Sequence, residues 1–158
     1  MSFSEKVFLV KKFIIYVVFV FVVAFSGYFI YGYMQSAKYD GTAVPYIEKV
    51  LPELSSWDVS RVTQCMAPEI VATISSEDLT ELLKSLSQIG TLQSISEATF
   101  KNKAVGKNVK YADAPVITYD IETQYSSGPA TVTLSLLDRD GQYQIYYFNF
   151  QSQALAAQ

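Results

Sequence analysis

The chain has 158 residues, of which 50% are apolar and 15% aromatic, and its formal net charge is −3 at pH 7. This composition allows a packed core and excludes wholesale disorder, and the length fits one domain with an appendage. From residue 38 onward the chain carries 9 basic and 14 acidic residues, a net charge of −5. Nucleic-acid binding depends mainly on Lys and Arg, so we expect no nucleic-acid partner.

Histidine is absent, and Cys65 is the single cysteine. The chain therefore lacks the commonest general base and metal ligand, and it cannot form an intramolecular disulfide or a thiolate metal site. We expect no metal, no cofactor and no catalytic residue. Cys65 is interpreted as a small buried hydrophobic residue rather than a reactive thiol, because no histidine is present to activate it.

An uncharged segment of 25 residues runs from Phe13 to Ala37. A helix of about 20 apolar residues crosses the hydrocarbon core of a bilayer, so we predict a tail at residues 1–12 and a transmembrane helix at 13–34. Lys11 and Lys12 precede the helix, which predicts a cytoplasmic N-terminus and an extracytoplasmic (periplasmic) domain beyond the inner, or plasma, membrane. The predicted anchor residues are Phe13, Ile14, Val17, Phe21, Phe25, Tyr28 and Tyr31.

Two other interpretations of this segment fit less well. Ala24-Phe25-Ser26 resembles a signal-peptidase cleavage site, but the apolar stretch of a signal peptide is usually about 7–15 residues long. A type IV prepilin would need a basic leader ending in glycine and a glutamate five residues into the apolar stretch. Neither feature is present, so a retained anchor is favoured.

A polar stretch at residues 35–43 is predicted to link the anchor to a soluble domain at residues 44–152. Apolar residues recur from Val44 to Leu54 at helical spacing. Pro45 suits the first turn of that helix, and Pro52 is expected to kink or end it.

Two further helices are predicted from their capping residues. Asp58 is a good N-cap for a short helix that Pro68 closes. Ser75, followed by an acidic first turn, caps a longer helix, and Gly90 is expected to end it in a left-handed conformation. The apolar stripe of this longer helix is Leu79, Leu82, Leu83, Leu86 and Ile89.

After Gly90 the apolar period changes from about 3.6 to 2 residues, which predicts strands. Turns are expected at 126–129 and 138–141, where Gly follows polar residues. The order of helices before an antiparallel meander predicts an α+β fold, with helices on one face of a curved sheet and a tail at 153–158. The predicted strands are 92–101, 117–125, 130–136 and 142–151.

Four motifs lie within residues 44–151: Trp57-Asp58, Ser75-Ser76-Glu77-Asp78, Ile89-Gly90-Thr91-Leu92-Gln93-Ser94 and Asp140-Gly141-Gln142-Tyr143. Through these motifs the sequence resembles the nuclear-transport-factor-2-like (cystatin-like) cone fold, and more narrowly a family of bacterial exported domains of unknown function. The resemblance implies a strongly bent sheet around a helix but no established activity. Tyr143 stands where that family usually has tryptophan. Periplasmic core subunits of type IV secretion systems share the plan of one membrane helix and a cone domain, but their Asn-Pro-x-Gly turn is absent here.

Three groups of residues are candidates for function. Some cone-fold proteins are isomerases with an aspartate base and a tyrosine donor, for which Asp120, Glu122 and Tyr119 could serve. Strand alternation, however, puts the two carboxylates on one face and the tyrosine on the other. A basic patch is predicted at Lys101, Lys103, Lys107 and Lys110, and a partner interface on the aromatic last strand at Tyr146, Tyr147, Phe148 and Phe150.

Each of the last two groups has a structural alternative. The lysines can form a solvated hairpin tip, and a helix or the chain terminus can cover the aromatic face. We therefore expect a non-enzymatic accessory or assembly subunit of a bacterial envelope complex, which contacts other envelope proteins or a second copy of itself. The alternatives are a small-ligand binding cone domain and, with less support, an isomerase-type enzyme.

Overall fold

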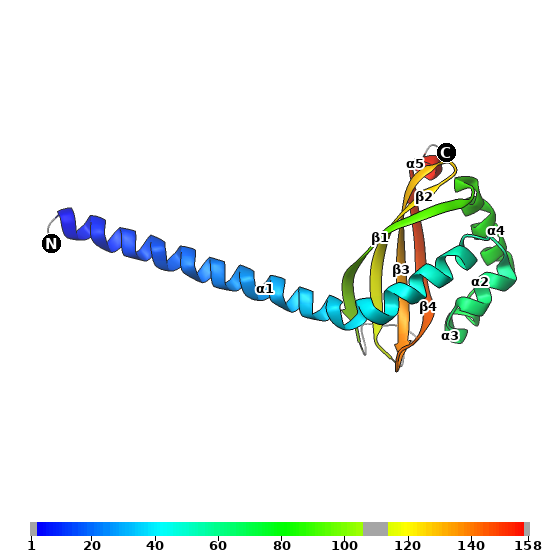
Figure 1. Ribbon diagram of the computed structural model, residues 1–158, viewed down its shortest axis with the longest axis horizontal. Coiled ribbons are helices and arrows are strands. Elements are labelled where there is room, and N and C mark those ends of the chain that lie inside the picture. Colours follow the sequence, from blue (N-terminus) through cyan, green and yellow to red (C-terminus); the bar gives the residue numbers. More distant parts are fainter. Residues whose placement is uncertain (1–2, 106–113, 157–158) are drawn as a thin grey trace. The chain divides into compact units, whose positions relative to one another are not determined.

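The computed structural model describes residues 3–105 and 114–156 (Figure 1). All its helices except α5 precede a four-stranded antiparallel sheet in the order β1-β2-β3-β4, which confirms the predicted α+β class. The helices are α1 (Phe3–Leu54), α2 (Val59–Cys65), α3 (Pro68–Val71), α4 (Ser76–Leu86), a 3₁₀ turn η1 (Ser87–Ile89) and α5 (Gln153–Ala156); the strands are β1 (Leu92–Ala104), β2 (Val116–Tyr125), β3 (Gly128–Arg139) and β4 (Gln142–Ser152).

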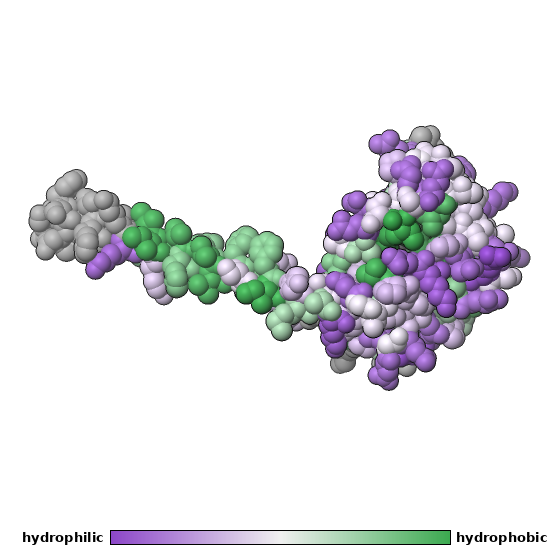
Figure 2. All heavy atoms as spheres, viewed as in Figure 1, coloured by the Kyte–Doolittle hydropathy of each residue, from purple (hydrophilic) through white to green (hydrophobic). Residues whose placement is uncertain are grey.

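The chain divides into two compact units, residues 1–39 and 40–158. The first unit is helical and apolar, and it is long and apolar enough to cross a membrane (Figure 2). Between Phe13 and Met34 its large apolar side chains, apart from Val17, are exposed, as a lipid-facing helix requires. The hydroxyl of Ser26 donates to the Val22 carbonyl at 2.7 Å, so this polar group is satisfied within the helix. Of the predicted anchor residues, Val17 is half-buried and the others are exposed.

Residues 35–43, predicted as a linker, are helical and belong to α1. The stretch is polar but contains no proline, and its weakest helix former is Gly41. Polarity alone therefore did not mark a break. As a result Pro45 lies inside α1 rather than in a first turn, and Pro52 lies in the last turn before Leu54. The predicted tail is also partly helical, as α5.

The two predicted N-caps of the second unit are confirmed. Asp58 accepts a hydrogen bond from the Arg61 amide at 2.9 Å at the start of α2, and Ser75 accepts one from the Asp78 amide at 3.0 Å at the start of α4. Helix α4 buries Leu79, Leu83 and Leu86, but Leu82 of the predicted stripe is exposed. Pro68 begins α3 rather than closing α2. Gly90 was predicted to end α4 in a left-handed conformation, but it follows η1 instead, and its ψ of −148° lies outside the left-handed helical region. Its φ of +85° nevertheless favours glycine.

The inner face of the sheet holds the core. In β2, Ile117, Tyr119 and Ile121 are fully buried, and their partners in β3 are Leu136, Leu134 and Val132. The part of α1 from residue 40 onward crosses this face (Figure 1). Its contribution to the core is Ala43, Ile47, Val50, Leu51 and Leu54.

Hydroxyl groups attach this part of α1 to the sheet at three points. Tyr119 Oη donates to Asp40 Oδ1 at 2.7 Å. The hydroxyls of Thr42 and Tyr143 lie 2.7 Å apart, and those of Ser55 and Tyr125 lie 2.6 Å apart. Each pair joins one residue of α1, or the residue just after it, to a tyrosine on the inner face, so the pairs set the position of the helix along the strands.

The curvature of the sheet comes from irregular pairing. Strand β1 shifts register against β2 at three places, between Leu92 and Ser94, Ile95 and Glu97, and Phe100 and Asn102. Strand β4 shifts once, opposite Ser135 and Leu136. Extra residues of this kind bend a strand and increase its twist. The result is a bent sheet over a helix, an arrangement compatible with a cone-like fold.

Trp57 joins the helices to one end of the sheet. It has φ +58°, which is unusual for a bulky residue. Its indole N–H donates to the Gly90 carbonyl at 3.0 Å, and its ring packs against Tyr125 and Phe150 with centroids 6.1 and 5.4 Å away. These contacts hold the backbone in its strained conformation.

The Ser55–Tyr125 bond provides a test of how α1 is attached. We expect Tyr125→Phe to lower the free energy of unfolding by about 1–3 kcal/mol, because it leaves the buried Ser55 hydroxyl without its partner. Adding Ser55→Ala should restore part of the loss. Urea unfolding of the full chain in detergent, followed by fluorescence of the single tryptophan, measures both. Additive losses in the double variant would contradict the coupling.

Glu97 and Glu122 are directly opposite each other on β1 and β2, and both are exposed. Like charges at opposed positions destabilise a sheet. Glu97→Lys should therefore raise the free energy of unfolding by about 0.2–1 kcal/mol. In a protein that carries Glu122→Gln, the same Glu97→Lys change should give a smaller gain, because the opposing carboxylate is absent. A Glu97→Lys protein no more stable than the parent would show that the two carboxylates do not repel each other measurably.

Candidate functional site

The outer face of the sheet carries the carboxylates considered for catalysis. Asp120 accepts a hydrogen bond from the Thr133 hydroxyl at 2.8 Å, and its other oxygen lies 3.0 Å from Lys101 Nζ. Glu122 is exposed on the same face, whereas Tyr119 is buried on the inner face. The structure therefore separates the tyrosine from both carboxylates, as strand alternation predicted, and these three residues do not form one site.

The predicted basic patch is described only in part. Lys101 is exposed and pairs with Asp120, and Lys103 is half-buried. Lys107 and Lys110 lie outside the described residues. The charge of Lys101 is thus partly neutralised by a carboxylate of the same sheet.

The four aromatic residues predicted as an interface do not share one surface. Phe150 is buried in the core beside Trp57. The ring of Phe148 lies on the same inner face, with its centroid 6.2 Å from that of Phe150. Tyr146 packs against a small outer cluster around Ala67, Val116 and Leu137. Tyr147 is 52% exposed. The register shift in β4 falls between Ile145 and Tyr147. Tyr146 and Tyr147 therefore both point away from the inner face.

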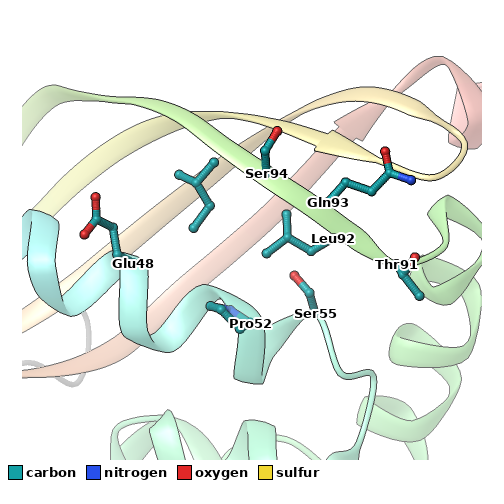
Figure 3. Close-up of a pocket in the computed structure, with 8 residues that line it drawn as sticks. Glu48, Pro52, Ser55, Thr91, Leu92, Gln93 and Ser94 are labelled. Atoms are coloured by element: carbon teal, nitrogen blue, oxygen red, sulfur yellow. The ribbon is translucent and has the colours of Figure 1, made fainter.

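A groove of about 590 Å³ lies between the end of α1 and the first half of β1 (Figure 3). Glu48, Pro52 and Ser55 come from the helical side. The other side is one unbroken run of backbone, from Thr91 to Ile95. The side chain of Leu92 points into the groove toward Pro52 and Ser55, and Glu48 extends from α1 toward β1 (Figure 3). The groove therefore has an apolar floor with polar groups at its rim.

Two other hollows differ from this groove: one has a more polar lining, and the other is smaller. One of about 640 Å³ lies where β2, β3 and β4 end beside α5, and Ser, Thr and Gln side chains with Glu122 form most of its wall. The other, of about 300 Å³, is lined by Cys65 with Tyr46, Lys49, Glu53 and Tyr143. In residues 3–105 and 114–156, no three metal-binding side chains lie together.

The groups around Cys65 keep the thiol protonated. Burial, and then the charge of Glu53, raise the pKa of the Cys65 thiol, while Lys49 opposes them. Burial also raises the pKa of Tyr46 to about 12, with a contribution from Cys65. The pKa of Tyr125 is likewise raised to about 12, chiefly by burial. At neutral pH these groups act as neutral hydrogen-bonding or packing groups. Cys65 is half-buried, whereas the sequence interpretation had it buried, but its raised pKa is in line with a thiol of low reactivity.

Alkylation of the single cysteine tests this environment. Because the thiolate is the reactive form, Cys65 should react with iodoacetamide more slowly at pH 8 than a free thiol. Glu53→Gln should increase the rate, since it removes a negative charge, and Lys49→Gln should decrease it. Rates can be followed by mass spectrometry of the full chain. Equal rates in both variants would rule out control by these charges.

Sequence reasoning did not find the groove beside β1. A signal is present: the apolar residues Leu92, Ile95, Ala98 and Phe100 are spaced by three, three and two residues rather than evenly by two. The two spacings of three coincide with the first two register shifts of β1. Uneven spacing of this kind predicts bulges, and with them a strand that curves away from its neighbours.

No family model matches the sequence, and no curated protein matches it.

Proposed function

We propose that this chain is a single-pass membrane protein whose domain of residues 40–158 serves as a docking subunit of a bacterial envelope complex. The observation that carries the proposal is the first part of α1, which is apolar on all sides and long enough to cross a bilayer. The lysines at positions 6, 11 and 12 favour a cytoplasmic N-terminus and an extracytoplasmic domain.

The proposal includes kinship with the cone-fold domains named above. Its support is a bent meander over a helix, together with the structural roles of the matching motifs. Trp57 joins the helices to the sheet, Ser75 caps α4, and Gly90 has a positive φ. These roles concern folding, so they favour a shared architecture and carry no activity.

A second candidate is binding of a small ligand, and the groove beside β1 favours it because its volume of about 590 Å³ is within the usual range for ligand sites. The inner face itself is filled by α1, so a ligand would lie at the edge of the cone rather than in its centre. The isomerase hypothesis receives no support from Asp120 and Glu122, which lie on the outer face.

The docking function can be tested with the full chain tagged at its own locus and purified in mild detergent. We expect the protein to elute in an assembly much larger than its mass of 17.7 kDa with bound detergent. Replacing residues 13–34 with an unrelated apolar helix should keep the domain at the membrane and preserve the assembly if the domain makes the contacts. A strictly monomeric protein without partners would refute the proposal.

A further inference from the structure

We propose that the groove between α1 and β1 binds an extended peptide of a partner protein, which adds to the free edge of β1 and carries apolar side chains with at least one Lys or Arg. This inference rests on the proposed docking function, and it names the surface and the chemistry of the partner.

The shape of the groove indicates a strand rather than a compact ligand. In the described residues β1 pairs with β2 alone, so its other edge has no strand beside it. Five consecutive residues, Thr91 to Ile95, line the groove, which means that the groove follows the strand edge. A backbone edge of this kind is the site at which extended peptides add to a sheet.

The floor of the groove fits apolar side chains of such a peptide. Leu92 and Ile95 are half-buried, because α1 does not fully cover this end of β1. Figure 2 shows apolar residues gathered over β1 on this face of the domain. A peptide strand presents every second side chain to one face, so it can place them on Leu92, Ile95 and Pro52 while its backbone pairs with β1.

Charge selects a basic partner. Among the described residues that line the groove, Glu48 is the single charged one, and its side chain extends toward β1 (Figure 3). It is exposed and forms no ion pair among the described residues. The chain from residue 38 onward has a net charge of −5. A Lys or Arg of the peptide beside Glu48 would therefore gain attraction from the nearby carboxylate and from the domain as a whole.

The same charge disfavours a second copy of this chain as the occupant. Two copies that paired edge to edge through β1 would bring two acidic domains and two Glu48 side chains toward one interface. The opposite edge of the sheet is less available, because Met66 forms a parallel bridge to Ile145 of β4 and the Ala67 amide donates to the Ile145 carbonyl at 2.8 Å.

Site-specific crosslinking in the native host tests the proposal. The photoreactive residue p-benzoylphenylalanine is placed at Gln93, which lines the groove. In a matched control protein it is placed at Glu81, an exposed position of α4. We expect an adduct from Gln93 alone, joined to a segment of another protein that alternates apolar residues and contains Lys or Arg. Glu48→Lys should lower the adduct yield about tenfold, whereas Glu81→Lys should leave it unchanged.

The crosslinked segment, made as a synthetic peptide, is then added to the full chain in detergent. We expect slower hydrogen exchange at the amides of residues 91–95. Tryptophan fluorescence verifies that each variant is folded. Lack of protection, an adduct between two copies of this chain, an adduct to a small molecule or lipid, or a yield insensitive to Glu48→Lys would each overturn the inference. An intact assembly without a Gln93 adduct would overturn it too and leave the docking function standing, whereas a monomeric protein would refute both.

Discussion

The seating of residues 40–54 of α1 on the inner face of the sheet is the contact on which the rest of the domain depends. Ala43, Ile47, Leu51 and Leu54 are completely buried there. Burial of such side chains contributes roughly 1.5–3 kcal/mol for each of the larger ones. The hydrogen bonds of the three tyrosine hydroxyls fix the position of the helix along the strands, since each can form only when helix and strand are in register. Without this helix the inner face of the sheet would be exposed to water.

The bent edge strand and the groove have one physical origin. A flat sheet would leave β1 level with β2, and a single helix could not cover the inner faces of all four strands. The register shifts of β1 curve the strand around the side of α1. Around Leu92 and Ile95 the strand is nevertheless only half-covered, so an open apolar strip remains between helix and edge. Curvature thus makes the core compact and leaves the groove at its margin.

Local features of this fold could be predicted from sequence, and long-range ones could not. Asp58 and Ser75 each accept a hydrogen bond from an amide three residues away, so the residue type alone indicates the cap. The turn at Asp140-Gly141 requires positive φ at both positions, which this residue pair predicts in the same way. Helicity at residues 35–43 depends on the helical segments at both ends of that stretch. The extra residue in β4 near Tyr146 depends on pairing with β3, and it decides which aromatic side chains reach the surface. The groove depends on α1 and β1 together, which are far apart in the chain.

The bridge from Met66 to Ile145 has a consequence for stoichiometry. It interrupts the outer edge of β4 in the middle of the strand, so a second sheet could join there only by displacing the segment between α2 and α3. A sheet with two open edges can add copies on both sides and grow into a fibre. Here one edge is interrupted and the other is irregular, so growth by strand addition ends after one step. A domain that accepts one peptide strand at β1, as proposed, would therefore bind its partner one to one and would not polymerise by strand addition.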